Sequence, residues 1–266
     1  MNFLKSIFEF HHKAAYAALF GILLLIAFAI TSPMGNQEYY GLFRYDYLLF
    51  YALIIQACLI LLKLESWAEA KVIAIFHIMA MLMEIFLTHP QIASWYYPQP
   101  AVFKIMTVPL FAGFMYSAVG SFFARSLRLY EVSFTRLPTF ANMLSLAVLS
   151  YLNFMTKFFI HDFRNVLFLW SIVIFWDTKI YFKLQHHQMN LPMLPVLIVL
   201  AFMIWIAENI STFYKIWLYP SQVETWHVVG WGKIGSWYLL LLLSLVLVLK
   251  ILGQRDQTGQ WTLKAK

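Results

Sequence analysis

The sequence predicts an all-α membrane protein, a bundle of about eight transmembrane helices. The 266-residue chain is 62% hydrophobic and only 12% charged, whereas a soluble domain carries about 25% charged residues. Its mean hydropathy is +0.72. Its apolar runs have the length that a helix needs to cross a bilayer, and they are too long for barrel strands. This composition excludes a soluble enzyme, a disordered chain and a nucleic-acid binder.

The apolar runs define the expected elements in chain order. The predicted spans cover residues 14–32, 44–62, 71–88, 102–123, 138–157, 163–182, 191–211 and 236–252. The first run is longer than the apolar part of a signal peptide, so we expect it to be retained as a span. We expect residues 1–252 to form a single transmembrane helical domain and residues 253–266 to form a polar cytoplasmic tail.

The basic residues predict the orientation of these spans. Of the 19 Lys and Arg residues, 13 fall on the side of the N-terminus and 6 on the other side. Because cytoplasmic loops carry the excess of positive charge, we expect both termini in the cytoplasm. The net charge of +7 is then explained by topology and by contact with anionic lipid. We expect membrane lipids as partners and no nucleic acid, and the oligomeric state stays open.

A segment that begins at a buried acid recurs along the chain. The first copy comprises Glu84 to Thr88, Trp95, Tyr97-Pro98-Gln99 and Lys104-Ile105, and the second comprises Glu208 to Thr212, Trp217, Tyr219-Pro220-Ser221-Gln222 and Lys233-Ile234. The copies lie four spans apart and therefore share an orientation, which is consistent with a four-plus-four parallel repeat. The alternative is coincidence between two aromatic-rich membrane interfaces.

Polar side chains gather at one depth of the predicted bundle. Charged groups within hydrocarbon cost free energy unless they are paired or hydrated, so they tend to mark functional sites. The residues of this layer, taken as binding candidates beside the acids of the repeat, are Asp46, Lys104, Asp162, Asn209 and Lys233. We expect them to converge on a cleft among the helices. For Asp46 and Asp162, an ion pair or a helix N-cap is the structural alternative.

Glu84 is the leading catalytic candidate. His77 precedes it by seven residues and Thr88 follows it by four, so the three share one helix face. A carboxyl group away from water holds its proton more readily, which suits general-acid chemistry. We predict Glu84 and Glu208 as acid and base, with His77 as a relay. The structural alternative pairs Glu84 with Lys104 or Lys233.

Aromatic residues crowd the loops beside these acids. Trp95 and Tyr97 lie in the first such loop, and rings of this kind commonly form a belt at the membrane interface. The functional alternative is an aromatic-lined mouth for an apolar ligand, since ring faces stabilise positive charge. No HxxHH or HExxH motif occurs in the sequence, and we expect no metal and no other cofactor.

Several segments carry a likeness to a known family. They are Asp46–Phe50, Lys63–Lys71, Phe76-His77, Trp95–Pro98, Val108–Tyr116, Tyr151–Phe154 and Ile204–Ile210. In these segments the chain resembles the YoaT-like family of bacterial integral membrane proteins, catalogued as domain of unknown function 817. The resemblance implies a location in the bacterial inner membrane and supplies no activity.

A second likeness concerns the order of three features. Glu84 on a helix, the loop Trp95-Tyr96-Tyr97 and a following Val108-Pro109-Leu110 occur in that order. In this layout the chain resembles membrane carotenoid hydratases and small lycopene cyclases. The resemblance implies protonation of an isoprenoid double bond, with aromatic faces stabilising the carbocation.

Three functional hypotheses follow from these observations. The first is an intramembrane enzyme that acts on an apolar lipid or isoprenoid by acid/base chemistry. The second is a proton-coupled small-molecule transporter, suggested by the repeat and the buried acids. The third is a structural or assembly protein in which the polar groups serve packing alone. Whether the chain is an enzyme stays open at this point.

Overall fold

The computed structural model describes residues 3–184, 187–255 and 261–263. In this part of the chain the structure is mostly helical, with nine α-helices and several short strands. The strands show that the all-α expectation was wrong in detail. The chain divides into two compact units. The first unit comprises Met1–Leu19, Gly120–Met203 and Gly232–Lys266, and the second comprises Phe20–Val119 and Ile204–Trp231.

The second unit is built mainly from helices. It contains α2 (Leu19–Ile30), α3 (Arg44–Leu61), α4 (Trp67–Leu87), the hairpin of β1 (Lys104–Ile105) and β2 (Val108–Pro109), the beginning of α5 (Ala112–Leu129) and the end of α8 (Met193–Phe213). A capping box starts α4, because Glu69 N donates to Ser66 Oγ at 3.2 Å and Ser66 N donates to Glu69 Oε2 at 2.6 Å.

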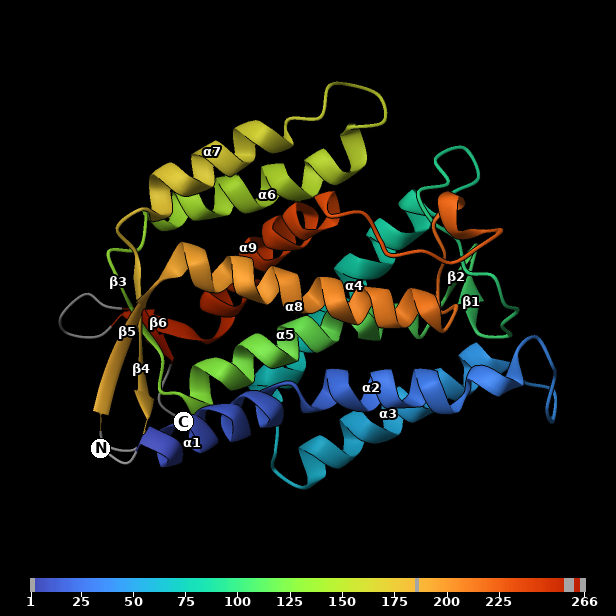
Figure 1. The fold of residues 1–266 in the computed structure, drawn as a ribbon, viewed down its shortest axis with the longest axis horizontal. Helices are drawn as coiled ribbons and strands as arrows, with labels where there is room; N and C mark the ends of the chain where they lie inside the picture. The colour runs from blue at the N-terminus through green and yellow to red at the C-terminus, as the bar shows by residue number, and fades with distance from the viewer. Residues whose placement is uncertain (1–2, 185–186, 256–260, 264–266) are drawn as a thin grey trace. The chain divides into compact units, whose positions relative to one another are not determined.

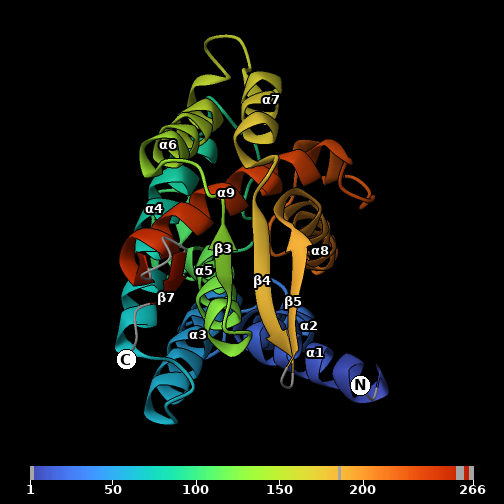
Figure 2. The same ribbon diagram turned by 90° about the vertical axis from the view of Figure 1, so that its left-hand side faces the viewer.

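The first unit combines helices with a sheet. Its helices are α1 (Phe3–Ala17), α6 (Phe140–Thr156), α7 (Arg164–Phe175) and α9 (Gly232–Leu252), and its strands are β3 (Ser133–Thr135), β4 (Lys179–Leu184), β5 (His187–Pro192), β6 (Gly253–Arg255) and β7 (Trp261–Leu263). In Figure 1, α6 and α7 lie side by side. The strands pair antiparallel in the order β5-β4-β3-β7-β6, and Figure 2 shows the long β4 and β5 hairpin next to β3.

Several helices have the length and composition of membrane spans. Among the described residues, α3, α4, α8 and α9 are long and apolar enough to cross a bilayer. The consecutive helices Lys5–Ala17 and Leu19–Met34 raise this number to five if they form one broken span. Two shorter apolar helices, α6 and α7, accompany them. These helices indicate a multi-pass membrane protein.

Some predicted boundaries were wrong. The run 102–123 begins as the β1–β2 hairpin, and α5 starts only at Ala112, after Pro109. The run 163–182 ends as a helix at Phe175, because residues from Lys179 onward pair in the sheet. Within the expected tail 253–266, the described residues form β6 and β7, and residues 256–260 and 264–266 lie outside the described part.

Candidate functional site

Glu84 is held by three neutral donors inside the second unit. It lies near the end of α4 and is only 1% exposed. Its Oε2 accepts hydrogen bonds from Trp95 Nε1 at 2.8 Å and from the Tyr97 hydroxyl at 2.9 Å. Its Oε1 accepts from the Tyr116 hydroxyl at 2.7 Å. Within the described part of the chain, none of its hydrogen bonds comes from Lys or Arg, so the expected alternative of an ion pair with Lys104 or Lys233 is not what holds this acid.

Glu208 occupies a similar setting in the same unit. It lies on α8, is 3% exposed, and its Oε1 accepts from the Tyr219 hydroxyl at 2.5 Å. Tyr219 also lies within electrostatic range of Glu84. Tyr116, which binds Glu84, is in turn within range of Glu208. The two acids therefore belong to one cluster of carboxyl groups and phenols.

The loops that supply these tyrosines carry the same motif and pair with each other. One loop contains Trp95-Tyr96-Tyr97-Pro98 and the other contains Trp217-Leu218-Tyr219-Pro220. Their second residues meet in an antiparallel bridge, in which Tyr96 N donates to Leu218 O at 3.0 Å and Leu218 N donates to Tyr96 O at 3.0 Å. In each loop the tyrosine before proline binds the acid that lies 11 or 13 residues earlier in the chain. Tyr96 and Leu218 hold the same position in their motifs, and each donates to the carbonyl oxygen of the other. A local two-fold axis produces pairing of this kind.

Arg44 fixes the two loops in place. Its side chain is 1% exposed at the start of α3. The guanidinium donates to Gln99 Oε1 at 3.2 Å in the first loop and to Tyr214 O at 2.9 Å after α8. It also donates to Phe28 O at 2.7 Å and to Thr31 Oγ1 at 3.0 Å at the end of α2. Several donors in a rigid fork suit this bridging role, which a lysine could not reproduce.

Asp46 holds the first loop from the other side. It is fully buried, and its carboxylate accepts from Phe43 N at 2.9 Å at the start of α3. The same carboxylate accepts from Val102 N at 3.0 Å and Phe103 N at 2.8 Å. In this structure the backbone amides of the loop therefore take up the accepting oxygens of the Asp46 carboxylate.

The loop tyrosines stay protonated at neutral pH. Burial raises the pKa of Tyr97 well above its usual value of 10.0, and the neighbouring Glu84 carboxylate raises it further. Burial, followed by Glu208, has the same effect on the pKa of Tyr219. Both phenols therefore remain neutral donors toward the acids. As a carboxylate, Glu84 accepts hydrogen bonds from all three of its donors.

Aromatic rings surround the Glu84 side of the cluster. Tyr45 contacts Tyr97 edge-on, with ring centroids 5.9 Å apart, and stacks on Phe111 at 5.0 Å. Trp95 contacts Tyr219 edge-on at 6.2 Å. An acid held by neutral donors within an aromatic cluster is an arrangement that can exchange a proton.

His77 lies on α4, two turns before Glu84, a separation of about 10 Å along the helix axis. Its ring packs against Phe114, with centroids 4.6 Å apart, and covers Gly113. A Cβ at Gly113 would lie 2.5 Å from His77 Nδ1, so glycine is what allows this contact. Within the described residues Nδ1 is buried without a hydrogen-bond partner. His77 therefore shares the helix with Glu84 but does not touch it.

The other predicted site residues have surroundings of their own. Lys104 is exposed in β1. Asn209 donates to Trp205 O at 2.7 Å and accepts from Val229 N at 2.8 Å, which ties α8 to the following loop. Asp162 and Lys233 belong to the first unit. There Asp162 accepts from Asn153 Nδ2 at 2.9 Å and forms an ion pair with Arg164 at 2.8 Å.

Sequence reasoning missed two of the tyrosines that bind the acids. Tyr219 stood in the recurring segment but was not proposed as a partner of Glu208, and Tyr116 was not proposed as a site residue. One signal could have pointed to Tyr116: Gly113-x-x-Tyr116 at the start of α5 recurs as Gly235-x-x-Tyr238 at the start of α9. Among the described residues, no group of three or more His, Cys, Asp or Glu side chains is arranged to hold a metal ion.

Comparison with known proteins bears on the whole chain. The family described as "Protein of unknown function (DUF817)" matches residues 6–245. The "Uncharacterized protein YoaT" of Bacillus subtilis (strain 168) is 35% identical over 258 residues, which cover 97% of this chain and 96% of that protein. No solved structure matches the chain. The resemblance seen in the sequence is thereby confirmed.

Proposed function

The chain belongs to the DUF817 family, and we propose that it is an intramembrane enzyme that acts on an apolar lipid or isoprenoid by acid/base chemistry. Glu84 and Glu208 are its acid and base. The observation that carries this proposal is the setting of Glu84, a buried carboxyl group whose hydrogen-bond partners in the described structure are all neutral and aromatic. An acid neutralised by a fixed cation would have little reason to change its protonation state, whereas this one is free of that constraint.

Each residue then has a chemical role. Glu84 delivers a proton to the substrate, while Trp95 and Tyr97 present ring faces to the positive charge that develops. Glu208, beside Tyr219, removes a proton to complete the reaction. His77 carries protons further along α4, where its unpartnered Nδ1 can accept one. Asp46 and Arg44 position the aromatic loop and take no part in proton transfer.

The test compares Glu84→Gln with wild type. Both proteins, together with Glu38→Gln at an exposed position, are purified in mild detergent, and the copurifying lipids and pigments are identified by mass spectrometry. We expect wild type and Glu38→Gln to hold the same specific apolar molecule and Glu84→Gln to accumulate its precursor. Bulk phospholipid of identical composition in all three proteins would overturn the proposal.

A proton-coupled transporter is the second candidate, and the paired loops favour it. The bridge between Tyr96 and Leu218 joins equivalent positions of the two copies, and Phe-Arg opens both α3 and α7, at Phe43-Arg44 and Phe163-Arg164. These observations support a four-plus-four parallel repeat, and with it we propose eight spans and both termini in the cytoplasm. Transporters often place substrate and ion sites at the interface between such repeats.

The transporter makes a separate prediction. Proteoliposomes of wild type would acidify or alkalinise in response to an imposed gradient of the carried solute, as read by an enclosed pH-sensitive dye. Glu84→Gln and Glu208→Gln would each abolish that response, because each removes a titratable group. If neither acid affects lipid turnover or flux, and both variants only lower stability, the cluster serves assembly alone. For either function we propose the bacterial inner membrane as the location and membrane lipids as partners.

A further inference from the structure

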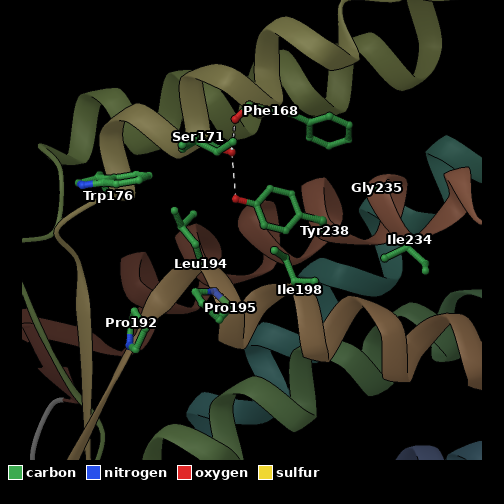
Figure 3. A pocket seen from close by; sticks show the side chains of 11 residues that line it. Phe168, Ser171, Trp176, Pro192, Leu194, Pro195, Ile198, Ile234, Gly235 and Tyr238 are labelled. Carbon is green, nitrogen blue, oxygen red and sulfur yellow. Dashed lines mark hydrogen bonds between the residues drawn. The ribbon is translucent and has the colours of Figure 1, made fainter.

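An apolar cavity of about 660 Å³ lies within the first unit. Its walls come from α7, from the start of α8 and from the start of α9, as Figure 3 shows. The volume is in the range of small-molecule sites, about 300–1,000 Å³. None of its lining residues carries a charge. A phospholipid headgroup would therefore find no ionic partner here, whereas an uncharged apolar molecule would fit.

The cavity has one polar handle, formed by Ser171 and Tyr238. Their hydroxyl oxygens are 2.9 Å apart, and Ser171 Oγ donates its hydrogen to Phe168 O at 2.7 Å. Since Ser171 has a single hydrogen, the Tyr238 hydroxyl must be the donor in the bond between them. The Tyr238 oxygen is then left with accepting capacity only. Figure 3 shows the Tyr238 side chain reaching across from α9 to α7 at this point.

The wall beside this handle depends on a glycine. A Cβ at Gly235 would lie 2.6 Å from Phe168 Cζ, so the absence of a side chain lets the Phe168 ring lie over α9. There it contacts the Tyr238 ring edge-on, with centroids 5.9 Å apart. Ile198 and Trp176 line the cavity and are themselves well exposed. In a bilayer such side chains face hydrocarbon, so a ligand can enter from the lipid phase.

We propose that this cavity binds one long-chain apolar alcohol from the membrane, with the alcohol hydroxyl donating to the oxygen of Tyr238. The apolar lining takes the chain, and the accepting phenol selects a hydroxyl over an ether or a ketone. The site uses no residue of the acid cluster, because that cluster belongs to the second unit. The inference therefore goes beyond the proposed function and stands or falls separately from it.

The test measures binding of radiolabelled oleyl alcohol and geranylgeraniol to the full chain in phosphatidylcholine nanodiscs. The methyl ether of each alcohol keeps the chain and removes the donor. We expect wild type to prefer at least one alcohol over its ether by about threefold to tenfold, the worth of one neutral hydrogen bond. The alcohol that binds more tightly shows whether the ligand is a straight-chain or an isoprenoid alcohol.

Two variants locate the site. The double variant Ser171→Ala/Tyr238→Phe removes both accepting oxygens and is expected to bind alcohol and ether equally. Ile198→Trp adds bulk at an exposed lining position and is expected to abolish binding of both without disturbing the core. Tyr40→Phe, at a fully exposed tyrosine, is the matched control and should behave as wild type. Equal affinity of wild type for alcohol and ether, preference retained in the double variant, or unchanged binding by Ile198→Trp would overturn the proposal.

Discussion

Glu84 and Asp162 are two acids that the sequence placed at the same depth, yet the structure gives them opposite settings. Glu84 is 1% exposed and bound by neutral donors. The side chain of Asp162 is 36% exposed and paired with Arg164. Asp162 is thus neutralised by a neighbouring cation at a loop, as a structural ion pair is. The comparison shows that the bonding partners of an acid matter more than its depth in the bundle. They distinguish a residue that can transfer a proton from one that forms a structural ion pair.

The largest expected effect follows from Glu84→Leu. This change leaves the hydrogens of Trp95, Tyr97 and Tyr116 without their shared acceptor, and each unsatisfied buried donor costs about 1–3 kcal/mol. We expect the free energy of unfolding to fall by about 3 kcal/mol or more, measured by denaturant titration in detergent micelles. Glu38→Leu, at an exposed position, should change it by less than about 0.5 kcal/mol. Equal stability of the two variants would contradict the geometry of the cluster.

Tyr97→Phe removes one donor and keeps the ring. Glu84 in its acid form is a neutral acceptor, and a neutral hydrogen bond is worth about 0.5–1.5 kcal/mol, so we expect a loss of that size in the same titration. Tyr40→Phe removes an identical hydroxyl from a fully exposed ring and should cost nothing measurable. A loss as small as that of the control would mean that Glu84 gains little from the loop tyrosine.

Stability at alkaline pH tests the buried tyrosines of both loops. The pKa of Tyr97 and that of Tyr219 are raised in the folded chain by burial, well above 10.0. A group whose pKa is raised on folding contributes stability below its unfolded value and loses that contribution as pH rises. We therefore expect the melting temperature to fall above about pH 10, and to fall less steeply in Tyr97→Phe. Parallel curves for the two proteins would argue against a buried phenol at this position.

The smallest effect on stability is expected for Asp162, at acid pH. Burial acts to raise the pKa of Asp162, but the hydrogen bonds from Asn153 and the Arg164 amide and the charges of Arg164 and Lys157 outweigh it, so the pKa lies below 3.8. Its contribution is present above that value and is lost as pH falls through the folded pKa. We expect Asp162→Asn to weaken the pH dependence of the free energy of unfolding only in that acid range. The change in that free energy should be less than about 1 kcal/mol. A larger change near neutral pH would place Asp162 in a buried network instead.

The sequence predicted the acids but only some of their partners. Hydropathy located most helices, and the recurring segment brought Glu84, Trp95 and Tyr97 into one hypothesis with Glu208. The segment did not include the Tyr116 contact, because that bond joins two residues 32 positions apart in the chain, on different helices. The strands could not be predicted from the sequence for a related reason. Residues 102–109 and 179–182 stand at the ends of apolar runs that hydropathy assigns to helices, and their pairing as strands is decided by tertiary contacts that composition does not record.

The most direct test of the central claim is infrared difference spectroscopy of the purified chain during a pH jump. If Glu84 exchanges a proton in its aromatic setting, wild type shows a band of a buried protonated carboxyl group that changes with pH. We predict that this band is lost in Glu84→Gln and retained in Glu38→Gln. A wild type without such a band, or a band unaffected by Glu84→Gln, would contradict the assignment of proton transfer to this residue.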